Sequence, residues 1–124
     1  MQLQPFFRSI LEQDTSEIVI CNLEHEILYM NPAACRHYEG FGGAALVGKN
    51  LMACHNSRSA GMIRNVLSWF AKSAENNRVH TFFSEKENKD IYMVALRNDQ
   101  GTLIGYYEKH EYRNRDMSGL YQMP

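Results

Sequence analysis

The order of strand-like and helix-like patterns is the feature that most restricts how this chain can fold. Two β-rich runs come first, three more come last, and the clearest helical pattern lies between them, at residues 59–72. Strands at both ends with helices between them predict an α+β fold, in which five strands form one antiparallel sheet covered by helices on one face. The predicted strands are residues 18–23, 27–30, 78–84, 90–96 and 103–112.

The segments around the first hairpin carry clear local signals. A polar stretch at residues 24–26 separates the first two strands and predicts a hairpin. Directly after the second strand, Asn31 stands before Pro32, an arrangement typical of a helix whose first residue is proline and whose cap is asparagine. Three glycines at positions 40, 42 and 43 predict that this helix is short.

Two helices are predicted to be amphipathic. Residues 5–13 place Phe6, Phe7, Ile10 and Leu11 at near-helical spacing, and such a stripe is exposed unless it docks on its own sheet. We therefore expect a homodimer that uses this N-terminal helix. The long helix at residues 59–72 is predicted to bury one broad apolar face against a large surface. That face consists of Met62, Ile63, Val66, Leu67, Trp69 and Phe70.

Composition restricts the class of protein. A chain of 124 residues with 44% hydrophobic and 22% charged residues fits one globular domain. The net charge of −1, without a basic block, argues against nucleic acid as a partner. No apolar run reaches the roughly 20 residues of a membrane span, and the start lacks the pattern of a signal peptide, so a cytoplasmic location is expected. Three cysteines without CxxC spacing predict reduced thiols.

Four segments in this order resemble the PAS domain family. They are residues 27–34, residues 46–51, the long helix, and residues 98–106, and together they span roughly residues 17–112. The resemblance implies a PAS domain over residues 17–112, preceded by an N-terminal helix at residues 1–16 for dimerisation and followed by a tail at residues 113–124. Residues 48–59 also resemble a bacterial PAS subgroup with a Cys-His pair, here Cys54 and His55, before the long helix.

The resemblance implies a sensor without catalytic activity. PAS domains respond to light, oxygen, redox state or metabolites through a pocket between the sheet and the helices. This sequence has no kinase, cyclase or DNA-binding segment, so the output is expected to pass through a separate signalling protein. No nucleophile and base are spaced to cooperate, which predicts that the chain is not an enzyme. The alternative to a ligand-binding sensor is an interaction protein, a dimerisation module that binds no ligand.

The candidate ligand-binding residues follow from the position of such a pocket. They come from the loop before the long helix, the helix itself and the inner sheet face. For Cys54 and His55 the alternative is a structural role in fixing the loop. We expect His55 to accept a hydrogen bond from a free N–H group of the long helix, in competition with Asn56. The candidates are Cys54, His55, Met62, Val66, Trp69, His80, Phe82, Met93 and Tyr106.

The sequence leaves open which cofactor, if any, the chain binds. The flavin-binding branch of the family has a motif resembling Asn-Cys-Arg-Phe-Leu, whereas this chain has Met-Ala-Cys-His at residues 52–55, so flavin is not expected. A haem sensor is the third functional hypothesis, beside the small-molecule sensor and the dimerisation module. Haem needs one axial histidine, and the candidates are His55, His80 and His110. Alternation along its strand predicts that His80 shares a sheet face with Phe82. No set of ligands converges as a structural metal site requires.

Overall fold

The structure, a computed structural model that describes all residues 1–124, contains one five-stranded antiparallel sheet with the strand order β2-β1-β5-β4-β3. Every neighbouring pair of strands is antiparallel, which confirms the predicted fold class. Three short 3-10 helices lie between α2 and α3, at Glu39–Phe41, Gly43–Leu46 and Leu51–Cys54. The other elements are α1 (Gln4–Gln13), β1 (Ile18–Asn22), β2 (Ile27–Met30), α2 (Pro32–His37), α3 (Ser57–Lys72), β3 (Arg78–Ser84), β4 (Lys89–Arg97) and β5 (Leu103–Tyr112).

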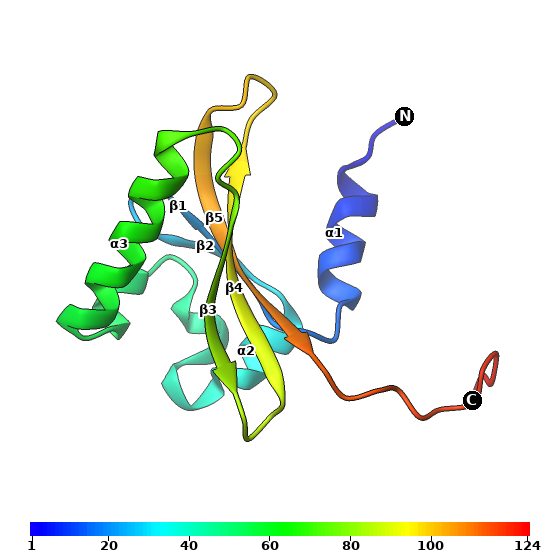
Figure 1. Cartoon of the computed structure of the whole chain (residues 1–124). Helices are drawn as coiled ribbons and strands as arrows, with labels where there is room; N and C mark the ends of the chain where they lie inside the picture. Colours follow the sequence, from blue (N-terminus) through cyan, green and yellow to red (C-terminus); the bar gives the residue numbers. More distant parts are fainter.

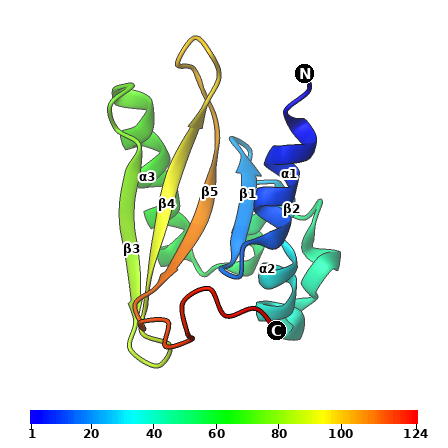
Figure 2. The ribbon, with the colours of Figure 1, turned by 90° about the vertical axis from the view of Figure 1, so that its right-hand side faces the viewer.

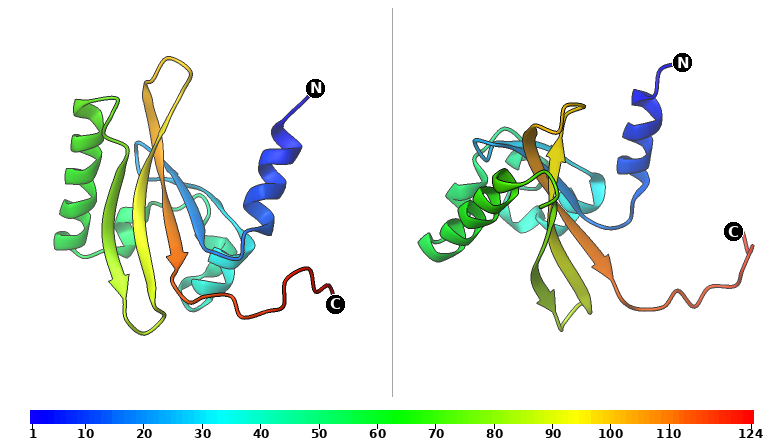
Figure 3. Two further views of the ribbon diagram at one scale, coloured as in Figure 1. Left: turned by 45° about the vertical axis from the view of Figure 1, so that its right-hand side comes forward. Right: turned by 45° about the horizontal axis from the view of Figure 1, so that its top comes forward.

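The helices divide between the two faces of the sheet. The long helix α3 runs along one face, here called the inner face, and α1 lies on the opposite side, the outer face (Figure 1). Along the inner face, α3 lies behind β3 and β4, while α2 lies beside β1 and β2 (Figure 2). After β5 the tail runs away from the sheet and forms no further helix or strand (Figure 3). The inner face is therefore the one where a pocket between the sheet and α3 can form.

Most of the predicted elements are confirmed, some with different bounds. The strands β2, β3 and β5 have the predicted bounds, and α1 begins one residue earlier than predicted. The long helix begins two residues earlier, at Ser57, because the Asn56 side chain accepts a hydrogen bond from the Ser59 N–H and caps it. Lys89, which lies just before the predicted strand at residues 90–96, is the buried first residue of β4.

Asn31 connects three parts of the fold through one buried side chain. Its Oδ1 accepts hydrogen bonds from the N–H groups of Ala34, which confirms the predicted cap of α2, and of Ile18 at the start of β1, both at 3.0 Å. Its Nδ2 donates to the carbonyl of Leu11 at the end of α1 and to that of Ser16. Since each polar atom of the amide is used, Asn31 fixes where α1 ends relative to the sheet.

The apolar face of α3 is only partly buried, in contrast to the prediction. Phe70 has no exposed surface and belongs to the core with Met93 and Tyr106, but Met62 is 55% exposed and Trp69 is 40% exposed. The first half of α3 lines a cavity that is open to solvent, and this keeps its side chains accessible. Only Ala60 and Phe70 of α3 are therefore fully buried.

A β-bulge in β3 overturns one prediction about sheet faces. His80 pairs with Tyr92 and Phe82 pairs with Ile91, so Thr81 is the extra residue between them. The inserted residue reverses the alternation, which places Phe82 on the inner face with Val79 and leaves His80 on the outer face. His80 and Phe82 thus lie on opposite faces, because simple period-two counting does not account for a bulge. In addition, none of the helices combines the length and apolar character needed to cross a membrane.

Candidate functional site

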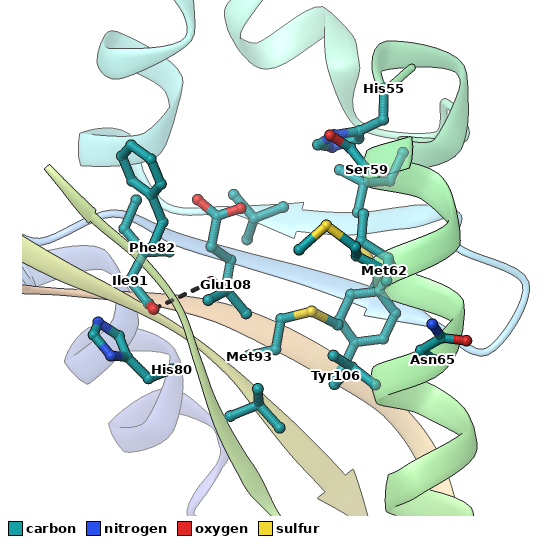
Figure 4. Close-up of a pocket in the computed structure, with 17 residues that line it drawn as sticks. His55, Ser59, Met62, Asn65, His80, Phe82, Ile91, Met93, Tyr106 and Glu108 are labelled. Carbon is teal, nitrogen blue, oxygen red and sulfur yellow. Dashed lines mark hydrogen bonds between the residues drawn. The ribbon is translucent and has the colours of Figure 1, made fainter. Parts of the chain in front are cut away.

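A cavity of about 540 Å³ lies between α3 and the inner face of the sheet. Figure 4 shows that its side chains come from α3 on one side and from the sheet on the other. Eleven of its 17 lining residues are hydrophobic, as is usual for a small-molecule site. The lining residues are Val19, Cys21, Leu51, His55, Ser59, Met62, Ile63, Asn65, Val66, Val79, His80, Thr81, Phe82, Ile91, Met93, Tyr106 and Glu108.

The regular periods of the helix and the strands explain why these residues meet. Ser59, Met62 and Val66 lie three and four residues apart, so they share one face of α3. On β5, Tyr106 and Glu108 are two residues apart and therefore point to the same sheet face. Both walls are thus mainly apolar, and the sheet supplies the one carboxylate, that of Glu108.

The structure brings seven of the nine predicted residues to this cavity. His80 borders it, but its imidazole turns to the outer face, where Nε2 lies 2.8 Å from Asp90 Oδ1. Cys54 is exposed at the end of a 3-10 helix, and Trp69 packs against Phe70 instead of the cavity. The seven are His55, Met62, Val66, His80, Phe82, Met93 and Tyr106.

His55 lies at the cavity but does not cap α3. The cap is supplied by the neighbouring Asn56 side chain, while the His55 N–H itself donates to the Met52 carbonyl and closes the preceding 3-10 helix. The expected hydrogen bond from the α3 backbone to the imidazole is therefore wrong. Asparagine serves better because its short side chain reaches the N3 position of the helix without strain.

Glu108 is the functional candidate that the sequence interpretation missed. It is not among the predicted ligand-binding residues, although period-two alternation from Tyr106 places it on the inner face. The side chain is only 25% accessible. Its Oε1 accepts a hydrogen bond from the Tyr38 hydroxyl at 2.6 Å and contacts His110 Nε2. Burial raises the pKa of Glu108, but the bonds to His110 and Tyr38 outweigh this effect and lower the pKa below its usual range.

A cluster of charged residues and one tyrosine continues from Glu108 away from the cavity, and its members Glu17, Lys89 and His110 are buried. Beyond Glu108, the other ring nitrogen of His110 lies 3.0 Å from Glu17 Oε2. Lys89 Nζ lies 3.7 Å from the same carboxylate and 2.7 Å from Glu87. Tyr112 donates its hydroxyl to Glu17 Oε1 at 2.7 Å. We call these residues, Glu17, Glu87, Lys89, Glu108, His110 and Tyr112, the ionic cluster.

The ionic cluster holds its central groups in their charged forms. Burial raises the pKa of Glu17, but His110 and the Tyr112 hydroxyl outweigh it and lower the pKa to about 2. For His110, burial lowers the pKa, and the contacts with Glu108 and Glu17 outweigh that effect and raise it. Each charge therefore depends on its buried neighbours, because an isolated charge is costly in this environment.

The residues present do not favour haem or a flavin nucleotide. Of the three candidate axial histidines, His80 turns to the outer face and His110 has both ring nitrogens against carboxylates, which leaves only His55 at the cavity. No lysine or arginine lines the cavity to pair with haem propionates or a flavin phosphate. No group of three His, Cys, Asp or Glu side chains is placed to hold a metal ion.

Comparisons with solved structures agree on one fold. The chain is similar to the PAS domain of a Colwellia psychrerythraea protein, with a TM-score of 0.66, 12% identity, and coverage of 90% of this chain and 98% of that one. It is similar to a C-terminal domain from Streptococcus mutans, with a TM-score of 0.66, 22% identity, and coverage of 86% and 81%.

A third similar structure comes from a receptor of known type. The Aer2 receptor from Vibrio cholerae, described as a dual PAS-haem oxygen sensor, matches with a TM-score of 0.57, 22% identity, and coverage of 77% of this chain and 91% of that one. No family model and no curated protein matches the sequence. At these identities the comparisons establish how the chain folds, and the ligand has to be inferred from the residues of this cavity.

Proposed function

We propose that this chain, which has the PAS fold, is a sensor domain that binds a small molecule between α3 and the sheet. The observation that carries the proposal is the cavity of about 540 Å³, which is mainly apolar and contains a few convergent polar groups. The chain is expected to act in the cytoplasm of a bacterium and to transmit ligand binding to a separate signalling protein.

The cavity supports binding and not catalysis. Its one carboxylate, Glu108, has an oxygen held by Tyr38 and His110, and no serine, cysteine or lysine nucleophile is hydrogen-bonded to a base there. Cys21 lines the cavity, but burial raises the pKa of its thiol to about 11, so it is protonated at neutral pH. We therefore expect no turnover of the bound molecule.

Native mass spectrometry of the purified protein tests the proposed function. We expect a complex whose extra mass is that of a small molecule and which disappears under denaturing conditions. Val66→Trp should abolish this species by filling the cavity, while Ser68→Trp, which adds the same side chain on the exposed side of α3, should retain it. An extra mass that survives Val66→Trp would place the molecule elsewhere and contradict the proposal.

A ligand-free dimerisation module is the second candidate, and one observation favours a dimer. Phe6, Phe7 and Ile10 on α1 are 57%, 56% and 65% exposed, so the apolar face of α1 is not covered by its own sheet. We propose that a second copy covers this face, since contiguous exposed apolar side chains mark interfaces. Sedimentation should give a dimer for the wild type and a monomer for Phe6→Ser combined with Ile10→Ser. A monomeric wild type at high concentration would rule this out.

A further inference from the structure

We infer that the molecule bound in the cavity is a small organic cation, an apolar body carrying one protonated nitrogen, and that Glu108 binds this nitrogen. The inference rests on the proposed function and specifies the chemistry of its ligand. Three observations carry it: the free oxygen of Glu108, the charge of the cavity wall and the apolar remainder of the lining.

The first observation is the unequal use of the two Glu108 oxygens. The hydroxyl of Tyr38 and the imidazole of His110 both bind Oε1, and neither uses Oε2. Figure 4 shows the carboxylate pointing into the space between Phe82 and Met62. Oε1 thus anchors the group to the protein, and Oε2 is left as an acceptor for a donor in the cavity.

The second observation is the sign of the charge around the cavity. Glu108 is the one acidic residue in the lining, and no lysine or arginine accompanies it. His110 contacts Glu108 on the side away from the cavity, and Tyr38, at the end of α2, donates a hydrogen bond to it. From the side of α3, the imidazole of His55 is the one titratable group that faces Glu108. A cationic ligand finds a partner in the carboxylate, whereas an anion is repelled by it.

The ionic cluster behind Glu108 also carries an excess of negative charge. Glu17, Glu87 and Glu108 contribute three negative charges, and Lys89 with protonated His110 contributes two positive ones. His37 approaches Glu17 at 3.6 Å, and this contact is with Glu17 and not with Glu108. The ionic cluster as defined therefore contains one more carboxylate than cations, and Glu108 is the carboxylate with a free oxygen at the cavity.

The third observation is the apolar surface that surrounds this single charge. Met62, Val66 and Met93 form much of the wall, and both methionines can adapt to a ligand of irregular shape. A hydrogen bond between a protonated nitrogen and a carboxylate is stronger in such surroundings than in water. Binding therefore requires a ligand whose body is hydrophobic and whose one polar end is a cation.

Two matched sets of compounds test the inference on the wild-type protein. Each set keeps the body and changes the end group: tryptamine, tryptophol and indole-3-acetate, and hexylamine, hexanol and hexanoate. Isothermal titration calorimetry at pH 7 should give the amine at least about tenfold higher affinity than the alcohol of the same set, and no measurable binding of the acid.

Two substitutions on β5 separate the direct contact of Glu108 with the ligand from a general effect of removing a negative charge. Glu108→Gln should reduce the affinity for the amines by about tenfold and leave that for the alcohols within about twofold. Glu111→Gln removes the same charge on the outer face, where Glu111 pairs with Lys109 at 2.7 Å, and should change neither affinity. If Glu108→Gln does not fold, the ranking in the wild type decides by itself.

The outcomes distinguish this inference from the proposed function. Equal affinity for amine and alcohol, or tighter binding of the acid, would overturn the cationic ligand while leaving the cavity as a binding site. Absence of binding by both amines would also overturn it. The proposed function is decided independently, by whether the co-purified small molecule is lost in Val66→Trp.

Discussion

The inner side of β5 changes its chemistry within four residues. Tyr106 lies among the apolar residues of the cavity, beside Met93, whereas His110 lies buried between two carboxylates of the ionic cluster. Glu108 stands between them and belongs to both regions, since it lines the cavity and contacts His110. The two regions are adjacent on one strand, yet they are stabilised in different ways.

The difference shows how one small sheet can carry an accessible cavity next to a region with fixed side-chain partners. The cavity has few fixed partners, and Met62 and Phe82 at its wall remain 55% and 60% exposed, so side chains can move to admit a ligand. In the ionic cluster, Lys89 and His110 are each 2% exposed, and the carboxylates of Glu17, Glu87 and Glu108 supply their counter-charges. We therefore expect substitutions in the ionic cluster to affect folding and substitutions in the cavity to affect binding.

The largest effect is expected for Lys89→Met. This change leaves Glu87 without its cation and removes one of the cations that contact Glu17, and removing one partner of a buried ion pair costs about 3–5 kcal/mol. Chemical denaturation should show this loss. The control Lys86→Met removes an exposed lysine of the same β3–β4 turn and should change the stability by less than about 0.5 kcal/mol. Equal effects of the two substitutions would remove the distinction between the regions.

The dependence of stability on pH should also come from the ionic cluster. His110 has a raised pKa in the folded state, so its contribution is fully present below about 6.5, the pKa of an unperturbed histidine, and is lost as pH rises through the folded value. Glu17 has its pKa lowered from 4.5 to about 2, so its contribution is present above 4.5 and is lost as pH falls toward 2.

Thermal unfolding from pH 3 to pH 9 measures this prediction. The wild type should be most stable between the two limits, near pH 5 to 6. In His110→Gln the decline above that range should be absent, because no proton is bound there in the folded state. A variant that keeps the same alkaline decline would show that another group causes it.

Two methionines sharpen the comparison inside the cavity. Met93 is 7% exposed and belongs to the core, so Met93→Ala should cost about 2 kcal/mol or more. Met62 is 55% exposed, so Met62→Ala should cost at most about 1 kcal/mol and act mainly on ligand affinity. Denaturation of both variants checks this order, and a larger loss for Met62→Ala would mean that the cavity wall supports the fold.

The smallest effect is expected for His55→Ala. Because Asn56 and not His55 caps α3, removal of the imidazole should cost less than about 1 kcal/mol, and any larger change should be in ligand binding. Thermal unfolding and native mass spectrometry of the variant measure the two effects. Unfolding at room temperature would make His55 a structural residue.

The sequence predicted the elements well because their signals are local. The cap at Asn31, the Gly-interrupted short helix and the bounds of β5 each depend on a few consecutive residues. The position of the cavity followed from the order of these elements. Seven of nine predicted lining residues reach it, and for those on α3 and β5 the helical and strand periods determine which face a side chain occupies.

What the sequence did not predict depends on contacts between distant segments. The bulge at Thr81 reverses the faces of His80 and Phe82, and period-two counting contains no sign of it. Glu17 and Lys89 are 72 positions apart in the sequence, and their pairing at 3.7 Å appears only when β1 and the β3–β4 turn are folded. Glu108 was not predicted to line the cavity because a carboxylate on an inner face is unexpected until its buried partners are known.

The most direct test of the account is methyl NMR of the protein labelled at its methionines, freed of any co-purified molecule by unfolding and refolding, with a deproteinised bacterial cell extract added. Met62 and Met93 line the cavity, whereas Met117 and Met123 in the tail are 79% and 82% exposed and serve as internal controls. We predict that the Met62 and Met93 signals shift while those of Met117 and Met123 do not. Unchanged Met62 and Met93 signals at high extract concentration would contradict a ligand site between α3 and the sheet.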